Sequence, residues 1–184
     1  MVKNDHKVCV FDSGIGGLNL LYECVRRLPC VDFTYFADNF RMPYGNKDKS
    51  ILINYVDEIF DKINKINPSA ALIACNTVTA SCIDYLREKY EFPILGIQPA
   101  VKPAVKSGGK CLVLATPITA ESAAMKNLVN KYGEGRTQVV AIPQLAALVE
   151  EKTTVISREE VEKYLPKVKP DTVVLGCTHY IYVK

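Results

Sequence analysis

The sequence has 184 residues, of which 48% are hydrophobic and 23% charged, a composition that excludes disordered and fibrous proteins. Its apolar segments are all shorter than a membrane span, and residues 1–6 lack the apolar core of a secretion signal, so we expect a cytoplasmic protein without membrane association. The net charge of +3 comes from lysines and arginines scattered among acidic residues, which argues against a nucleic-acid partner.

In the first half of the chain, short β-rich runs alternate with helical patterns. We expect strands at 7–11, 33–37, 70–74 and 94–96, and helices at 18–28, 50–66 and 79–89. The second of these helices has apolar residues at positions 52, 56, 59, 60, 63 and 66, which is the spacing of one buried face. Gln98 and Pro99 interrupt the alternation and mark the expected boundary between two halves.

The second half repeats the alternation. We expect strands at 111–115, 138–142 and 172–176, and helices at 120–132, 143–151 and from about 158. Ser157, with Glu160 three residues later, predicts a capping box at the start of the last helix. The order predicts an α/β protein of two similar parallel-sheet units, with helices on both faces and the active site in the cleft between them.

The expected domains are residues 1–97, which carry Asp12 and Cys75, and residues 98–184, which carry Cys177 and His179. Both cysteines directly follow an apolar strand, and ligands of open α/β sheets bind beyond the carboxyl ends of such strands. Two thiols in such positions suggest two acid/base groups that face one substrate from opposite sides.

The seven cysteines, at positions 9, 24, 30, 75, 82, 111 and 177, include no CxxC pair. We therefore expect neither a disulfide framework nor a structural metal site, and we expect Cys9 and Cys111 to be small core residues. A tyrosine-phosphatase function is rejected because the arginine required six residues after Cys75 is replaced by Ser81. A Cys/His hydrolase that uses Cys177 and His179 stays open.

A glycine-rich turn follows the first expected strand, from Asp12 to Gly17. Its backbone N–H groups are suited to a carboxylate or a phosphate, but a plain tight turn is an equally good interpretation. The turn lacks the lysine and the serine or threonine that end a P-loop, and it lacks the full GxGxxG spacing of a dinucleotide site.

Four segments, 10–18, 42–45, 74–80 and 175–180, read VFDSGIGGL, MPYG, ACNTVTA and LGCTHY. With these segments in this order, the chain resembles the glutamate racemases of the cofactor-independent aspartate/glutamate racemase superfamily. The resemblance implies that one cysteine thiolate removes the α-proton of glutamate while the opposite thiol donates a proton to the other face.

The resemblance also assigns roles to residues. It implies that Cys75 and Cys177 are the two bases, that Asp12 assists on the Cys75 side, and that His179 and Glu150 assist on the Cys177 side. Substrate contacts are expected from Ser13, Tyr44, Gly45, Asn76, Thr77, Thr116, Thr119 and Thr178.

The implied biology is the supply of D-glutamate for peptidoglycan, and hence for cell-wall biogenesis and cell shape, by a cytoplasmic enzyme that needs no cofactor and no metal. Aspartate racemase, hydantoin racemase and maleate isomerase share the two-cysteine layout, but the motif set favours glutamate as the small-molecule substrate.

Family members continue with a segment that returns to the first domain, whereas this sequence ends four residues after Tyr180, and Ile181 replaces the usual proline. We therefore expect a homodimer that covers apolar surface. The alternative is a catalytically impaired homologue that binds an amino acid or a protein.

Overall fold

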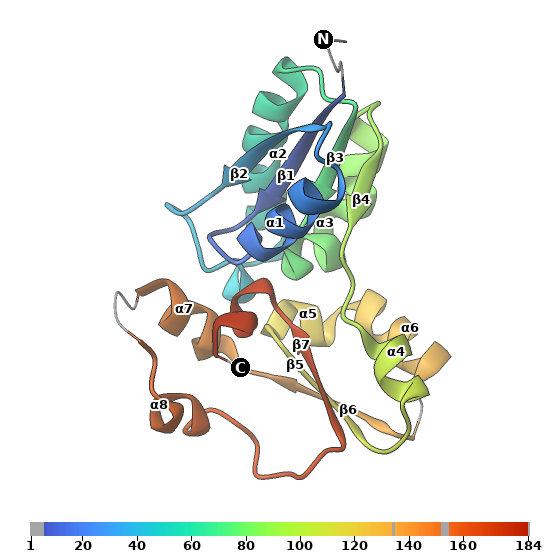
Figure 1. Ribbon diagram of the computed structural model, residues 1–184, viewed down its shortest axis with the longest axis vertical. Helices are drawn as coiled ribbons and strands as arrows, with labels where there is room; N and C mark the ends of the chain where they lie inside the picture. Colours follow the sequence, from blue (N-terminus) through green and yellow to red (C-terminus); the bar gives the residue numbers. More distant parts are fainter. Residues whose placement is uncertain (1–5, 134, 152–154, 184) are drawn as a thin grey trace.

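The computed structural model describes residues 6–133, 135–151 and 155–183 and contains two separate parallel sheets, one above the other in Figure 1. The first sheet has the strand order β2-β1-β3-β4 and the second the order β6-β5-β7. The strands are β1 (Lys7–Asp12), β2 (Asp32–Ala37), β3 (Ala70–Ile73), β4 (Ile94–Gly96), β5 (Cys111–Ala115), β6 (Thr137–Ala141) and β7 (Thr172–Gly176). The predicted α/β class with two parallel-sheet units is confirmed.

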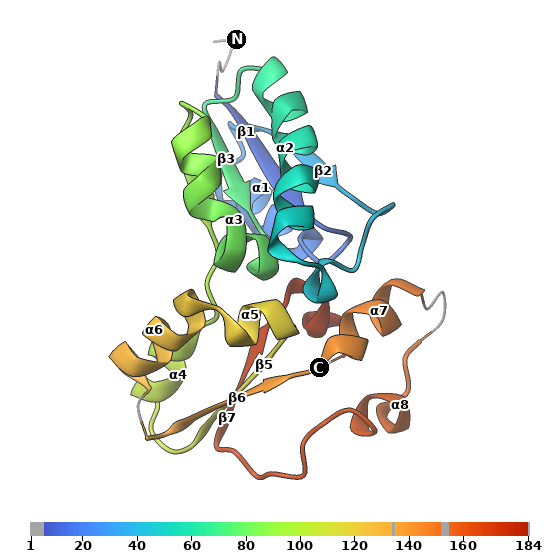
Figure 2. The same cartoon turned by 180° about the vertical axis from the view of Figure 1, so that it is seen from behind.

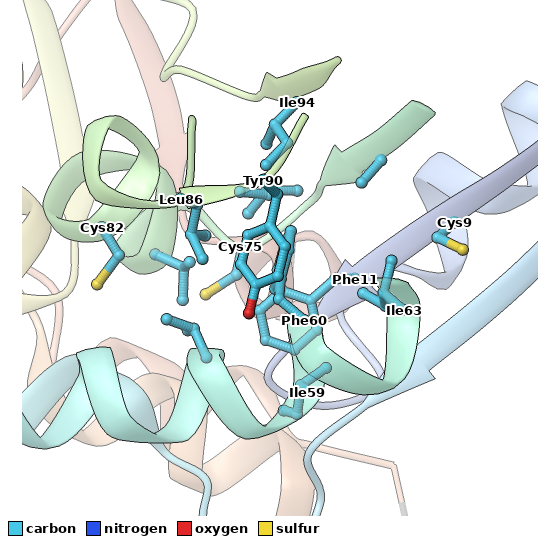
Figure 3. Packing of buried hydrophobic residues seen from close by; sticks show 14 of the residues in the cluster. Cys9, Phe11, Ile59, Phe60, Ile63, Cys75, Cys82, Leu86, Tyr90 and Ile94 are labelled. Atoms are coloured by element: carbon cyan, nitrogen blue, oxygen red, sulfur yellow. The ribbon is translucent and has the colours of Figure 1, made fainter. Parts of the chain in front are cut away.

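Helices cover both faces of the first sheet. The long helices α2 (Lys49–Lys65) and α3 (Asn76–Lys89) pack on one face, and α1 (Leu18–Arg27) lies on the other, as the two opposite views show (Figures 1 and 2). The core under α2 and α3 is rich in aromatic rings (Figure 3). Phe60 lies at its centre, with its ring centroid 5.7 Å from that of Phe11 and 5.7 Å from that of Tyr90.

The second sheet is also covered on both faces. Successive side chains of its central strand β5 point to opposite sides, and each side packs against helices. Cys111 and Val113 face a cluster formed with α4 (Val101–Lys106) and α6 (Ala123–Tyr132). Leu112 and Leu114 face a second cluster formed with α7 (Pro143–Glu151) and α8 (Arg158–Glu162).

The helix predicted at 120–132 is present from residue 123 and ends at 132 as expected, but its start is wrong, because two helices occupy this region. They are α5 (Pro117–Glu121) and α6, and Ser122 between them has extended backbone, with φ −61° and ψ 149°. The Ser122 hydroxyl accepts a hydrogen bond from the Met125 N–H, which is the bond of an N-cap.

Other helices differ in extent or were not expected. Helix α3 begins at Asn76, three residues earlier than predicted, so Cys75 is its N-cap residue. Helix α4 was not expected, and it contains Pro103, which a helix tolerates in its first turn. Two 3₁₀ helices, η1 (Tyr44–Asn46) and η2 (Thr178–Val183), were also not expected. The capping box of Ser157 and Glu160 is present.

Parallel strands place the loops that follow them at one edge of each sheet. The loops after β1 and β3 meet the loops after β5 and β7 in the seam between the two sheets (Figure 1). Asp12, Cys75, Thr116 and Cys177 all stand at such strand ends. None of the helices among the described residues combines the length and apolar character needed to cross a lipid bilayer.

We expect Phe60→Ala to lower the free energy of unfolding by about 3 to 5 kcal/mol, because it leaves a cavity among buried rings. Urea unfolding followed by circular dichroism measures this loss. Phe40→Ala is the matched control, since the Phe40 side chain is 96% exposed, and its effect should stay within about 0.5 kcal/mol. Similar losses in the two variants would contradict the packing described here.

Candidate active site

A cavity lies between the two sheets, where their loops meet. It is lined by Ser13, Pro43, Tyr44, Gly45, Cys75, Asn76, Thr77, Thr116, Ala146, Cys177, Thr178 and His179. Three further residues that the sequence analysis predicted lie behind this lining, and each forms a hydrogen bond with a lining residue. They are Asp12, Glu150 and Thr119. The cavity volume of about 10 Å³ is enough for about one water molecule.

Cys75 enters the cavity from the first sheet. It is buried and directly precedes α3, so the N–H groups of Thr77 and Val78 donate to its sulfur. The Ser13 hydroxyl oxygen lies 3.7 Å from this sulfur. Burial raises the pKa of the Cys75 thiol to about 12, with a smaller contribution from the negative charge of Asp12, and the N–H groups oppose this rise.

Cys177 enters the cavity from the second sheet, in a position that mirrors that of Cys75. It follows β7 and precedes η2, and the N–H groups of His179 and Tyr180 donate to its sulfur. Burial raises the pKa of the Cys177 thiol, and the charge of Cys75 adds to the rise. Each thiol therefore lies at the N-terminus of a helical turn, which offers dipoles that stabilise a thiolate.

His179 and Glu150 form a buried pair on the Cys177 side. The His179 Nε2 atom lies 2.5 Å from the Glu150 Oε1 atom, and the His179 Nδ1 atom lies 3.7 Å from the Cys177 sulfur. A carboxylate at Nε2 fixes a proton on that nitrogen and turns Nδ1 toward the thiol. Helix α7 thus holds the imidazole ring in place to exchange a proton with Cys177.

Asp12, at the end of β1, is the carboxylate around which the glycine-rich turn folds. Its Oδ2 atom accepts hydrogen bonds from the Gly14 and Gly17 N–H groups, and its Oδ1 atom accepts one from the Thr178 hydroxyl at 3.2 Å. Burial raises the pKa of Asp12 to about 6, against the positive charge of His179 and these hydrogen bonds. The turn therefore uses two of its N–H groups on its own aspartate.

The same turn joins the two halves. The Ile15 N–H donates to the Glu150 carboxylate at 2.8 Å, and a side chain at position 14 would collide with that carboxylate. Glycine at position 14 is thus required by the close approach of Glu150.

Hydroxyl groups form the opposite wall of the cavity. The Thr77 and Thr116 hydroxyl oxygens lie 3.0 Å apart, and the Thr116 hydroxyl donates to that of Thr119, also at 3.0 Å. Beside them, the buried Asn76 amide oxygen has no hydrogen-bond partner among the described residues. An acceptor of this kind, next to a cavity, is suited to a ligand N–H group.

The sequence did not reveal the residues that hold Tyr44. The buried Asp38 carboxylate accepts hydrogen bonds from the Tyr44 hydroxyl and from the Arg41 Nε atom, the latter at 2.7 Å. Arg41 in turn stacks on the Tyr55 ring and pairs with Glu58, both in α2. The spacing of Asp38 and Arg41, three residues apart just before the Pro-Tyr-Gly segment, is the signal that could have found them.

Pro43 and Ala146 also line the cavity without having been predicted. Both have apolar side chains, and no sequence motif marks Ala146. Within the part of the chain that the structure describes, no group of three or more His, Cys, Asp and Glu side chains is arranged to hold a metal ion.

Sequence comparison gives consistent relatives. Residues 30–182 match the family model described as Asp/Glu/Hydantoin racemase. A glutamate racemase of Clostridium acetobutylicum is 40% identical over 195 residues, which cover 100% of this chain and 75% of the relative. A glutamate racemase of Lachnospira eligens is 37% identical over 190 residues, which cover 97% of this chain and 71% of the relative.

Solved structures agree with these relatives. The crystal structure of Escherichia coli glutamate racemase in complex with L-glutamate and the activator UDP-MurNAc-Ala matches with a TM-score of 0.88 and 32% identity, covering 97% of this chain and 71% of that one. The structure of glutamate racemase from Francisella tularensis in complex with D-glutamate matches with a TM-score of 0.81 and 27% identity, covering 98% and 71%.

We expect Asp12→Asn to stabilise the protein near pH 7.5 and to have little effect near pH 4. Since burial raises the pKa of Asp12 from 3.8 to about 6, its stability contribution is greatest when it is protonated and is lost as the pH rises through about 6. At about 1.4 kcal/mol per pKa unit, the gain above pH 7 is about 3 kcal/mol.

Urea unfolding at the two pH values measures this difference. Asp32→Asn, which changes an exposed carboxylate at the start of β2, is the control and should change little at either pH. A loss of stability in Asp12→Asn that is equal at both pH values would contradict the expected cost of burying the charge.

Proposed function

Because the chain belongs to the Asp/Glu/hydantoin racemase family, we propose that it interconverts L- and D-glutamate by moving the α-proton between two cysteine thiols. The observation that carries this proposal is that Cys75 and Cys177 line one cavity and come from opposite sheets. A thiolate on one side takes the α-proton, the electron pair stays on the substrate as a carbanion, and the thiol on the other side donates a proton to the opposite face. The structures of related glutamate racemases in complex with L-glutamate and with D-glutamate support this choice of substrate.

Formation of a thiolate is the step that this site has to assist. Burial raises the pKa of both thiols, so both are protonated near neutral pH while the cavity is empty. On the Cys177 side, His179 accepts the thiol proton at Nδ1 while Glu150 stabilises the imidazolium that results. On the Cys75 side, Asp12 is the available carboxylate, and the helix α3 N-terminus stabilises the thiolate.

Substrate binding rests on neutral groups. The residues that line the cavity include no lysine or arginine, so hydroxyl and amide groups hold the two carboxylates of glutamate. Ser13, Thr77, Thr116 and Thr178 supply hydroxyls, Thr119 supports Thr116, and Tyr44 and Gly45 close one side. The unpartnered Asn76 amide oxygen accepts a hydrogen bond from the substrate ammonium group.

A cavity that holds about one water molecule is too small for glutamate, so substrate entry requires the two halves to separate. The division into domains 1–97 and 98–184 fits this motion, because each half has its own sheet and its own core. The biological role that we propose is the supply of D-glutamate for peptidoglycan by a cytoplasmic enzyme.

The two cysteines give a direct test. We expect Cys75→Ser and Cys177→Ser each to lower the rate of racemisation by about 10²- to 10⁴-fold, because a serine hydroxyl does not form an alkoxide base at neutral pH. Formation of D-glutamate from L-glutamate, and exchange of the α-proton with deuterium from the solvent, measure the rate.

Cys82→Ser is the matched control, since Cys82 is a buried cysteine of α3 outside the cavity lining, and it should keep the wild-type rate. Wild-type protein that binds glutamate but never exchanges its α-proton would identify an amino-acid-binding protein instead. Faster turnover of aspartate than of glutamate would overturn the choice of substrate.

We also propose that the protein is a homodimer with α1 at the interface. Leu18, Tyr22 and Val25 lie on one face of this helix, with exposed fractions of 42%, 67% and 47%. Light scattering should show a dimer for the wild type and a monomer for Tyr22→Lys, because the new charge would have to be buried. A monomeric wild type, or a dimer that is indifferent to Tyr22→Lys, would refute this interface.

A further inference from the structure

Two tyrosines hold the glycine-rich turn, one from each half of the chain. The Tyr35 hydroxyl of β2 donates to the Gly14 carbonyl at 2.8 Å, and the Tyr182 hydroxyl of η2 donates to the Ile15 carbonyl at 3.2 Å. The Ile15 N–H lies between these two carbonyls in the chain and donates to Glu150 at 2.8 Å. The turn thus has fixed partners on both sides of the seam.

The Gly14 carbonyl and the Ile15 N–H belong to one peptide group. In a planar trans peptide these two bonds point in opposite directions, so fixing one of them fixes the other. Tyr35 holds the carbonyl end of this peptide, and Glu150 is bound at its N–H end. The orientation of one peptide therefore connects β2 of the first sheet with α7 of the second half.

Space for the Tyr35 hydroxyl comes from Gly17. A side chain at position 17 would lie 2.8 Å from the Tyr35 oxygen and 2.8 Å from the Asp12 Cβ atom. Burial, followed by the charge of Asp12, raises the pKa of the Tyr35 phenol, which keeps this hydroxyl protonated and able to donate.

We propose that Tyr35 is a positioning residue that acts through the Gly14–Ile15 peptide and Glu150 to fix the His179 ring beside Cys177. Each step is a hydrogen bond in the structure, from Tyr35 to Gly14 at 2.8 Å, from Ile15 to Glu150 at 2.8 Å and between Glu150 and His179 at 2.5 Å. Successive hydrogen bonds in such a series polarise one another, so the first donor affects the strength of the last bond. Tyr35 is not part of the cavity lining.

The charged and titratable groups around His179 are Glu150 of α7, Asp12 of β1 and Cys177 beside it. Of these, Glu150 is the group that Tyr35 reaches through a single peptide. Loss of the Tyr35 hydroxyl should therefore weaken the hold of Glu150 on the imidazolium form of His179.

The sequence offers a simple spectroscopic test because it contains only two histidines, His6 and His179. We expect Tyr35→Phe to move the His179 ring resonances at a fixed pH, measured by NMR, because the ring is then held less firmly between Glu150 and Cys177. The exposed His6 is the internal reference and should not move. Tyr164→Phe, at a surface position after α8, is the matched control.

A double-mutant cycle separates positioning from independent effects. Glu150→Gln should move the His179 resonances at least as far as Tyr35→Phe does, and Tyr35→Phe should add nothing to Glu150→Gln. Unchanged His179 resonances in Tyr35→Phe, or fully additive changes, would overturn the proposal. Tyr35→Phe removes one oxygen atom and keeps the ring, and urea unfolding verifies that the variant is folded.

Turnover gives a second readout, which rests on the proposed racemase function. We expect kcat of Tyr35→Phe to fall about 3- to 10-fold with KM unchanged, because Tyr35 acts on the proton-transfer groups and not on the substrate. Moved His179 resonances in a protein without racemase activity would refute the proposed function and leave the positioning role intact. A raised KM with unchanged kcat would refute the positioning role.

Discussion

Removal of the ionisable groups from water is the constraint on which the rest of this site depends. Burial is the largest cause of the raised pKa of Asp12, Cys75 and Cys177 alike. In a medium of low polarity, a charge is stable only where fixed dipoles replace water, and both thiols lie where helical N–H groups supply such dipoles. The same surroundings strengthen every hydrogen bond that the site contains.

This constraint explains why the site is built from two sheets instead of one. The carboxyl edge of a single parallel sheet presents its loops from one side only, whereas two such edges that face each other enclose a reacting carbon from both sides. The contacts between the halves include the hydrogen bonds from Thr178 to Asp12 and from Ile15 to Glu150, beside apolar packing of Ile118 of α5 against the core of the first half. Hydrogen bonds of this kind can break and form again at lower cost than a wholly apolar packed interface.

The sequence predicted strands and long helices well, because apolar periodicity reflects burial directly. It failed where local bonds decide the structure, as at Ser122, where a side-chain cap divides one expected helix into α5 and α6. The glycine-rich turn left two interpretations open, since only the fold shows that its N–H groups face Asp12. Motif resemblance named the residues around the cavity, and their catalytic roles stay predictions. Tyr35 carries no motif, because it acts through a contact with another element of the chain, and Asp38 and Arg41 show only their short spacing before the Pro-Tyr-Gly segment.

The seam between the halves is made of backbone at three glycines. Gly14 lies against Glu150, and side chains at Gly16 and Gly45 would come within 2.7 Å of the Thr178 Cβ atom and 2.6 Å of the Thr116 Cβ atom. A side chain at any of these positions would therefore have to displace a residue of the other half. The shape of the cavity can change without this displacement at Ala146 and Pro43, which line it with apolar side chains. The glycines are thus constrained by the close approach of the two halves, whereas the small apolar residues of the lining are constrained by the shape of the substrate.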